Sequence, residues 1–122
     1  MSKKVLIVDD EPNIVISLEF LVKKEGFTVA VAADGEEALA KVAEFSPDLI
    51  LLDVMMPKKS GFEVCEALRA DPARSGLKII MLTAKGRDTE MAKGLALGAD
   101  AYMTKPFSTK DLIARIREVL AA

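Results

Sequence analysis

The stretch Leu49-Ile50-Leu51-Leu52-Asp53-Val54-Met55-Met56-Pro57 decides the fold. Its apolar run at 49–52 lies between Pro47 and Pro57 and is short, so it predicts a strand that is buried on both faces rather than a helix. Asp53 stands where this strand ends, although aspartate is depleted in strands. The residue either caps the strand exit or presents a carboxylate at the edge of a parallel sheet where open α/β folds bind ligands.

Composition limits the classes of protein that the chain can belong to. Its 122 residues are 51% hydrophobic and 30% charged, which is the balance of a single globular domain with a real core. The net charge is -2 and no basic run exceeds Lys3-Lys4, so direct binding of nucleic acid by this chain is not expected. No apolar stretch has the length of a membrane span, and the run at 5–8 is too short for a signal peptide.

Cysteine and histidine content narrows the chemistry. The single Cys65 cannot form an internal disulfide, and its apolar neighbours predict a buried core thiol. Together with the lack of a predicted signal peptide, this favours a cytoplasmic location. The chain has no histidine, which excludes histidine-based triads, imidazole zinc sites and a phosphohistidine within this chain.

Four more segments have the pattern of strands, and helices alternate with them. The strand segments are 5–8, 28–32, 78–82 and 101–104. The expected helix starts are marked by Pro12, by Asp34, by Ser60 with Glu63, by Asp88, and by Ser108 with Asp111. This strict alternation predicts an α/β fold, a parallel sheet with helices on both faces.

Some expectations concern individual side chains and one connection. We expect the inner face of the second helix to be formed by Leu39, Val42 and Ala43. The fourth helix is expected to run through Met91, Leu95 and Leu97 and to stop at Gly98. Residues 74–76 are predicted to be loop.

Polar residues follow four of the five predicted strands. They are Asp9-Asp10 after the first strand, Asp53 at the end of the third, Thr83 after the fourth and Lys105 after the fifth. Each has a structural explanation of its own, as a helix cap, a turn former or a surface lysine. Because the carboxyl ends of parallel strands share one edge of the sheet, however, we expect all of them to lie together.

The residue types in this cluster indicate phosphoryl chemistry. Two carboxylates about 5 Å apart repel each other by roughly 3 kcal/mol at an effective dielectric constant near 20, so a cation is expected among them. Oxygen ligands alone favour a hard cation, and Mg²⁺ suits a site of few carboxylates that leaves room for phosphate oxygens. A hydroxyl and an ammonium group nearby complete a cradle for a phosphoryl group, with an aspartate as nucleophile.

The sequence resembles the receiver domains of two-component response regulators, and it is similar in size to the stand-alone chemotaxis regulator. The resemblance covers essentially the whole chain and depends on four motifs: Val8-Asp9-Asp10-Glu11, Leu51-Leu52-Asp53-Val54-Met55-Met56-Pro57, Leu82-Thr83-Ala84-Lys85 and Thr104-Lys105-Pro106-Phe107. It implies one domain over residues 1–122, with a flavodoxin-like doubly wound sheet of five parallel strands in the order 2-1-3-4-5 and five helices.

The resemblance also implies roles for the acidic cluster. Asp53 is the expected phosphorylated residue. Asp10 is implied as a direct Mg²⁺ ligand, Asp9 as a ligand through water, and the backbone carbonyl of Met55 as a third protein ligand.

Further roles are implied on the two strands beyond Asp53. The Thr83 hydroxyl and the Ala84 amide are expected to hold phosphate oxygens, and Lys105 to pair with the phosphate. The Lys105–Pro106 bond is expected to be cis. Tyr102 is implied as the mobile aromatic side chain that moves together with Thr83 in the switch. Lys93, Asp100 and Arg115 are expected as polar contacts of the surface that changes.

Two positions depart from the family pattern. Lys58-Lys59-Ser60 stands where the family often has an apolar residue and then Asp or Asn. Ala101 stands where many transcription-factor receivers carry a second acid, so any self-association is expected to be weak or dependent on phosphorylation.

Three functions compete. In the first, the chain is not an enzyme in its own right but a signalling switch: a histidine kinase or phosphotransfer protein supplies phosphate to Asp53, and a changed surface binds a downstream target that the sequence does not identify. In the second, it is an aspartate-based phosphatase, but such enzymes resemble Asp-x-Asp at the nucleophile and this chain has Asp53-Val54-Met55. A dinucleotide binder is the third, and no Gly-x-Gly-x-x-Gly follows the first strand. The switch is favoured. Whether the chain is a stand-alone regulator or a receiver from a longer protein stays open.

Overall fold

The computed structural model describes residues 3–56, 59–84, 88–105 and 107–121. They contain five parallel strands: β1 (Lys4–Val8), β2 (Thr28–Ala32), β3 (Leu49–Asp53), β4 (Lys78–Ala84) and β5 (Ala101–Lys105). The strands are hydrogen-bonded in the order β2-β1-β3-β4-β5. The expected flavodoxin-like order is therefore confirmed, and the crossover between β2 and β3 makes β1 and β3 neighbours at the switch point of the sheet.

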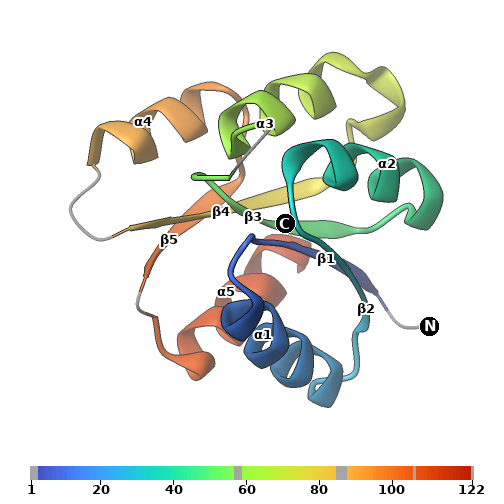
Figure 1. Ribbon diagram of the computed structural model, residues 1–122, viewed down its shortest axis with the longest axis vertical. Helices are drawn as coiled ribbons and strands as arrows, with labels where there is room; N and C mark the ends of the chain where they lie inside the picture. Colours follow the sequence, from blue (N-terminus) through green and yellow to red (C-terminus); the bar gives the residue numbers. More distant parts are fainter. Residues whose placement is uncertain (1–2, 57–58, 85–87, 106, 122) are drawn as a thin grey trace.

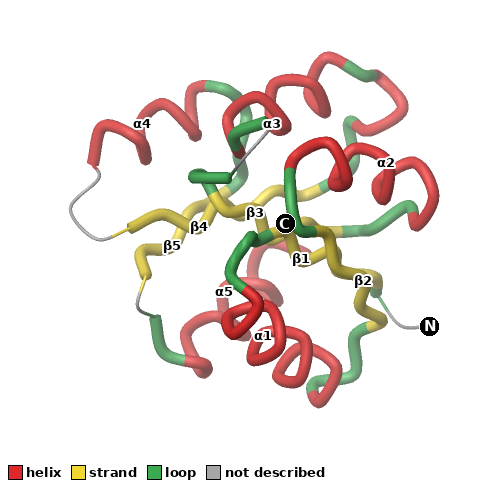
Figure 2. Tube along the Cα trace, in the orientation of Figure 1, coloured by secondary structure: helices red, strands yellow, loops and turns green. Residues whose placement is uncertain are grey.

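Helices cover the sheet on both faces (Figures 1 and 2). α2 (Gly35–Phe45), α3 (Gly61–Ala70) and α4 (Asp88–Ala96) lie on one face, and α1 (Pro12–Lys24) and α5 (Thr109–Ala121) lie on the other. A short 3-10 helix, η1 (Pro72–Arg74), follows α3, so the expected loop begins one residue later than predicted. Every helix in the described part of the chain is too short or too polar to cross a membrane.

Alternate residues of the central strands form two separate cores. Leu6, Ile50, Leu52 and Met81 pack toward α2, α3 and α4, whereas the neighbouring side chains of the same strands pack toward α1 and α5. All five residues of β3 are buried, as expected for a strand covered on both faces.

The prediction that Ala43 lies on the inner face of its helix was wrong, and the face of α4 toward the sheet is unusual. Ala43 is exposed, and Ala38 takes its place on the inner face of α2 beside Val42. Leu95 on α4 is 44% exposed, because the buried residue that faces the sheet there is Gly94. A Cβ atom on Gly94 would lie 2.6 Å from the Sδ atom of Met81, so the helix approaches β4 too closely for a side chain at that point.

Local hydrogen bonds explain where the helices next to the strand exits begin. Asp34 accepts a hydrogen bond from the Glu37 amide at the start of α2. Ser60 and Glu63 form the predicted capping box of α3, in which each side chain bonds to the backbone amide of the other residue. These caps position the loops after β2 and β3 at the carboxyl-end edge of the sheet.

Candidate metal and phosphoryl site

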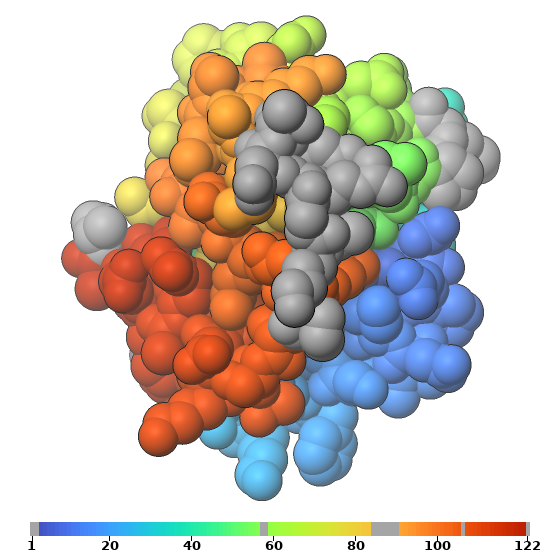
Figure 3. Space-filling model, turned by 90° about the vertical axis from the view of Figure 1, so that its left-hand side faces the viewer, coloured from blue at the N-terminus to red at the C-terminus, as the bar shows by residue number. Residues whose placement is uncertain are grey.

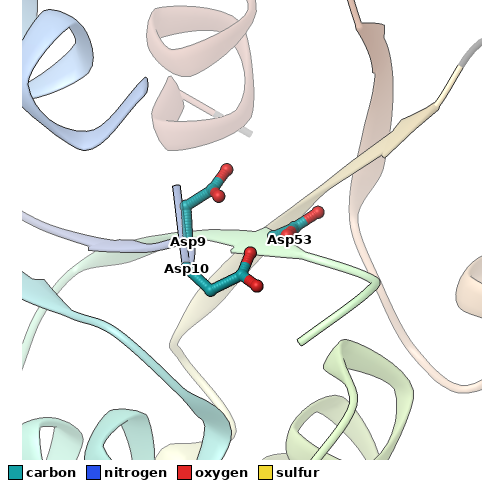
Figure 4. Close-up of side chains that lie close together, drawn as sticks. All are labelled: Asp9, Asp10 and Asp53. Carbon is teal, nitrogen blue, oxygen red and sulfur yellow. The ribbon is translucent and has the colours of Figure 1, made fainter. Parts of the chain in front are cut away.

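Three carboxylates meet at the carboxyl-end edge of the sheet. Asp9 and Asp10 follow β1, and Asp53 is the last residue of β3, the neighbouring strand. One carboxylate oxygen from each lies within 4.8 Å of the others, and Figure 4 shows the three side chains extending to the same side of the strand ends. The oxygen ligands of a bound Mg²⁺ lie about 3 to 4 Å from one another, so small side-chain movements would bring these oxygens around such an ion.

The three carboxylates differ in exposure and in partners. Asp9 is only 1% exposed, and its two oxygens accept hydrogen bonds from the Lys105 ammonium at 2.9 Å and from the Glu11 amide at 3.0 Å. Asp53 is 6% exposed and lies 3.4 Å from the same Lys105 nitrogen, whereas Asp10 is exposed. Asp9 is thus the carboxylate that protein donors engage most fully, and Asp10 is the one that faces solvent.

The electrostatic state of Asp53 reflects this crowding. Burial raises the pKa of the Asp53 carboxyl group, and the negative charge of Asp9 raises it further. Lys105 opposes both effects, and the result is a pKa of about 6 against an ordinary value of 3.8. A cation placed among the carboxylates would favour the ionised form and lower this pKa.

Lys105 is the cationic member of the cluster. Burial of its ammonium group disfavours the charge, but the hydrogen bond to Asp9 and the attraction of Asp53 outweigh burial and raise the pKa of Lys105 above its ordinary value. Lys105 therefore stays protonated and joins the ends of β1, β3 and β5.

Thr83 and Ala84 end β4, next to Asp53. Asp53 pairs with Leu82 in the parallel register, so Thr83 is one residue beyond the Asp53 level, and its side chain is 1% exposed. Ala84 is the last residue of the strand. The structure therefore brings Asp9, Asp10, Asp53, Thr83 and Lys105 to one edge of the sheet.

The remaining predicted site residues are described in part. The Met55 side chain is 60% exposed, which suits a residue whose expected contribution is its backbone carbonyl. Tyr102 is half-buried on β5, pairs with Met81 in the register and packs against the core cluster on the α4 side. The expected cis bond at Pro106 lies outside the described residues.

The structure gives partners for Lys93, Asp100 and Arg115, and their place on the surface that changes stays a prediction. Asp100 lies directly before β5. It accepts hydrogen bonds from Arg69 and from the Ile79 amide, both at 2.7 Å, at the opposite edge of the sheet. The Lys93 ammonium lies 4.6 Å from the centre of the Phe62 ring, and Arg115 pairs with Glu118 at 3.5 Å. Sequence periodicity had no signal for these partners.

Known proteins of one family have sequences similar to this chain. The sequence profile of the response regulator receiver domain matches residues 5–117. The chain is 49% identical over 120 residues to the alkaline phosphatase synthesis transcriptional regulatory protein PhoP of Bacillus subtilis, covering 98% of this chain and 49% of that protein. It is 47% identical over 117 residues to the DNA-binding response regulator MtrA of Mycolicibacterium smegmatis, covering 96% of this chain and 50% of MtrA.

A solved structure shows the same fold. The chemotaxis protein CheY4 of Vibrio cholerae superposes with a TM-score of 0.91 at 35% sequence identity, covering 98% of this chain and 99% of CheY4. The chain therefore belongs to the response regulator receiver domain family of two-component signalling. These domains are signalling switches that interact with histidine kinases. The chain spans about half the length of the curated relatives it matches.

Proposed function

We propose that this domain is a phosphorylation-activated switch that accepts a phosphoryl group on Asp53. The observation that carries the proposal is the cluster itself: three carboxylates within 4.8 Å of one another, with the Lys105 ammonium 2.9 Å from Asp9 and 3.4 Å from Asp53. A buried excess of negative charge is unfavourable in the unmodified fold, and it suits a site that binds a cation and a phosphoryl group.

Magnesium is the cation that the donor set favours, because all the side-chain donors are oxygens. Asp10, Asp53 and the Met55 carbonyl would hold it directly, and Asp9, whose oxygens already accept two protein hydrogen bonds, would contribute through water. The bound ion supplies positive charge that neutralises phosphoryl oxygens during transfer.

The protein residues account for the rest of the transfer. An oxygen of the Asp53 carboxylate bonds to phosphorus while the phosphorus–nitrogen bond of a donor phosphohistidine breaks, and the donor imidazole leaves with the bonding electron pair. The Thr83 hydroxyl and the Ala84 amide lie at the end of β4, where they would donate to phosphoryl oxygens, and Lys105 would pair with the new negative charge. These 122 residues contain no histidine, so the donor group lies outside this domain.

The surface beside the site supports a protein donor, a histidine kinase or a phosphotransfer protein. Ile16 and Phe20 stand one helical turn apart on α1 and are 65% and 71% exposed. A largely apolar pocket of about 630 Å³ opens between α1 and the start of α5, with Lys105 and Phe107 in its wall. Figure 3 shows α1, in blue, beside the orange and red segments of β5 and α5 on the face that carries the strand ends.

The change of target-binding surface is proposed at β5. Thr83 would move toward phosphoryl oxygens, and Tyr102, which packs on the core beside Met81, would respond to that movement. The family match over residues 5–117 supports a single receiver domain across residues 1–122. The downstream target, and any weak or phosphorylation-dependent dimer, depend on this surface.

Labelling by a small phosphodonor tests the function. Acetyl phosphate with Mg²⁺ should add one phosphoryl group, readable by intact mass, because the domain itself holds the cradle. Asp53→Asn should abolish the added mass, and Asp48→Asn, a change at an acid that bonds to the Lys4 amide away from the site, should label normally. Equal labelling of Asp53→Asn, or labelling without a divalent ion, contradicts the proposal. Many turnovers of phosphodonor per protein would favour the phosphatase alternative.

A further inference from the structure

The backbone of the proposed phosphoacceptor is in direct contact with the first residue of α3. Gly61 begins this helix and is buried. A Cβ atom on Gly61 would lie 2.9 Å from the Cα atom of Val54 and closer still to the carbonyl oxygen of Asp53. Contacts this short essentially never occur for real Cβ atoms, so only glycine fits against the Asp53–Val54 peptide.

This contact is reinforced by hydrogen bonds on both sides. The Gly61 amide donates to the Val54 carbonyl at 2.9 Å, and the Val54 amide donates to the Leu82 carbonyl of β4 at 3.1 Å. Val54 is only 1% exposed and belongs to the core. The end of β3 therefore cannot retreat from a larger residue at position 61 without breaking the sheet or the core.

The same connection is held at a second point. A Cβ atom on Gly35, the first residue of α2, would overlap the Cβ atom and the carbonyl oxygen of Lys59 and lie 3.0 Å from its carbonyl carbon. Lys59 immediately precedes the capping box of α3. Met55 lies in the chain between Asp53 and Gly61. The close contacts of Gly61 and Gly35 therefore limit the positions of Asp53 and Met55, the two proposed metal ligands in this segment.

We propose that Gly61, assisted by Gly35, is a positioning residue that sets the backbone of Asp53 and of the following turn for metal binding and phosphoryl transfer. The inference rests on the proposed function of Asp53. Sites that bind metals or transfer groups tolerate displacements of only about 0.5 Å. A side chain at position 61 would push α3 or Asp53 away by more than this tolerance. Neither glycine has a positive φ, so close approach, and not backbone conformation, excludes a side chain.

The test compares three alanine variants of the whole chain. Gly61→Ala should weaken Mg²⁺ binding, measured by calorimetry, about tenfold or more, as loss of supporting contacts around a metal does, and should slow labelling by acetyl phosphate. Gly35→Ala should give a smaller loss, because Lys59 is only partly buried and is farther along the chain from Asp53. Gly76→Ala is the matched control, since a Cβ atom there meets nothing within 4 Å, and it should behave like the wild type.

A purely structural role would lower the melting temperature and leave the Mg²⁺ affinity of the folded protein unchanged. Wild-type affinity and labelling in a folded Gly61→Ala protein would overturn the inference; if that variant does not fold, Gly35→Ala decides in the same way. Amide NMR of the metal-free proteins separates the two proposals. Shifted Asp53, Val54 and Met55 signals in Gly61→Ala would support positioning even if the wild type failed to bind Mg²⁺ or accept phosphate, a result that would refute only the proposed function. Unchanged signals would refute positioning.

Discussion

The two edges of the parallel sheet treat charge in opposite ways. At the amino-end edge, the Arg69 guanidinium donates to the carbonyl oxygens of Gly98 at 2.8 Å and Leu77 at 2.7 Å and to the Asp100 carboxylate at 2.7 Å. The same Asp100 oxygen accepts a hydrogen bond from the Ile79 amide. Here one cation meets one anion and several carbonyl groups, and the cluster joins α3, β4 and the turn before β5.

At the carboxyl-end edge, the charges of the described residues are not balanced. Among the residues that the structure describes, Asp9, Asp10 and Asp53 lie together, and the Lys105 ammonium group pairs with Asp9 and Asp53. The pKa of Asp53 is raised to about 6. The amino-end cluster is complete within the chain and serves stability. The carboxyl-end cluster lacks positive charge that a cation could provide, and this deficit separates a candidate functional site from a structural ion pair.

The largest expected effect is loss of the balanced cluster. Arg69→Met keeps much of the side-chain length but leaves the Asp100 carboxylate and three carbonyl groups without their charged donor. We expect a loss of about 3 kcal/mol in the free energy of unfolding, measured by urea denaturation. Arg115→Met is the matched control, because its pair with Glu118 is exposed and a loss below about 1 kcal/mol is expected.

Binding at the other edge should survive this change. The folded Arg69→Met protein should bind Mg²⁺ as the wild type does, since its contacts lie at the opposite ends of the strands. If Arg69→Met lowered the Mg²⁺ affinity as much as a substitution at the metal site does, the two edges would be coupled. The amino-end cluster would then not serve stability alone.

The sequence predicts the carboxyl-end site better than the amino-end cluster, and the reason is physical. The carboxyl-end site was predictable because its side chains follow directly after strands, and parallel topology brings strand exits together. The role of Arg69 was not predictable, because three of its partners are backbone carbonyl groups whose positions depend on turns, and carbonyl groups carry no sequence signal. The exposure of Leu95 was not predictable for a related reason: the spacing of apolar residues on α4 does not show how closely Gly94 approaches Met81.

The next effect comes from the unbalanced edge and concerns pH. Since the pKa of Asp53 is about 6 in the fold and 3.8 ordinarily, the folded state holds this proton more tightly. The protonated Asp53 carboxyl group therefore contributes on the order of 3 kcal/mol to the free energy of unfolding. This contribution is fully present below pH 3.8 and is lost as the pH rises through about 6. Asp53→Asn does not titrate, so without metal it should be more stable than the wild type above pH 6, and its advantage should shrink toward pH 4.

Urea denaturation between pH 4 and 7.5 measures this difference, and the absence of histidine removes the side chain that ordinarily titrates there. Mg²⁺ should stabilise the wild type above pH 6 and have little effect on Asp53→Asn. Parallel stability curves for the two proteins would mean that the carboxyl-end cluster is as balanced as the amino-end one.

The smallest expected effect is a shift in population at Tyr102, the single tyrosine of the chain. Tyr102 packs against the α4-side core, and its register partner Met81 lies two residues before Thr83. Beryllofluoride stands in for the phosphoryl group on Asp53, and NMR of the free and bound domain should show Tyr102 and the β5 amides shifting together with Thr83. A ligand shifts such an equilibrium only by its differential affinity for two states, so the free domain should already sample the bound form. Asp53→Asn with the same fluoride should show no shifts. Changes confined to the surroundings of Asp53, with Tyr102 and β5 unmoved, would show that the charge deficit at this edge is not transmitted to β5.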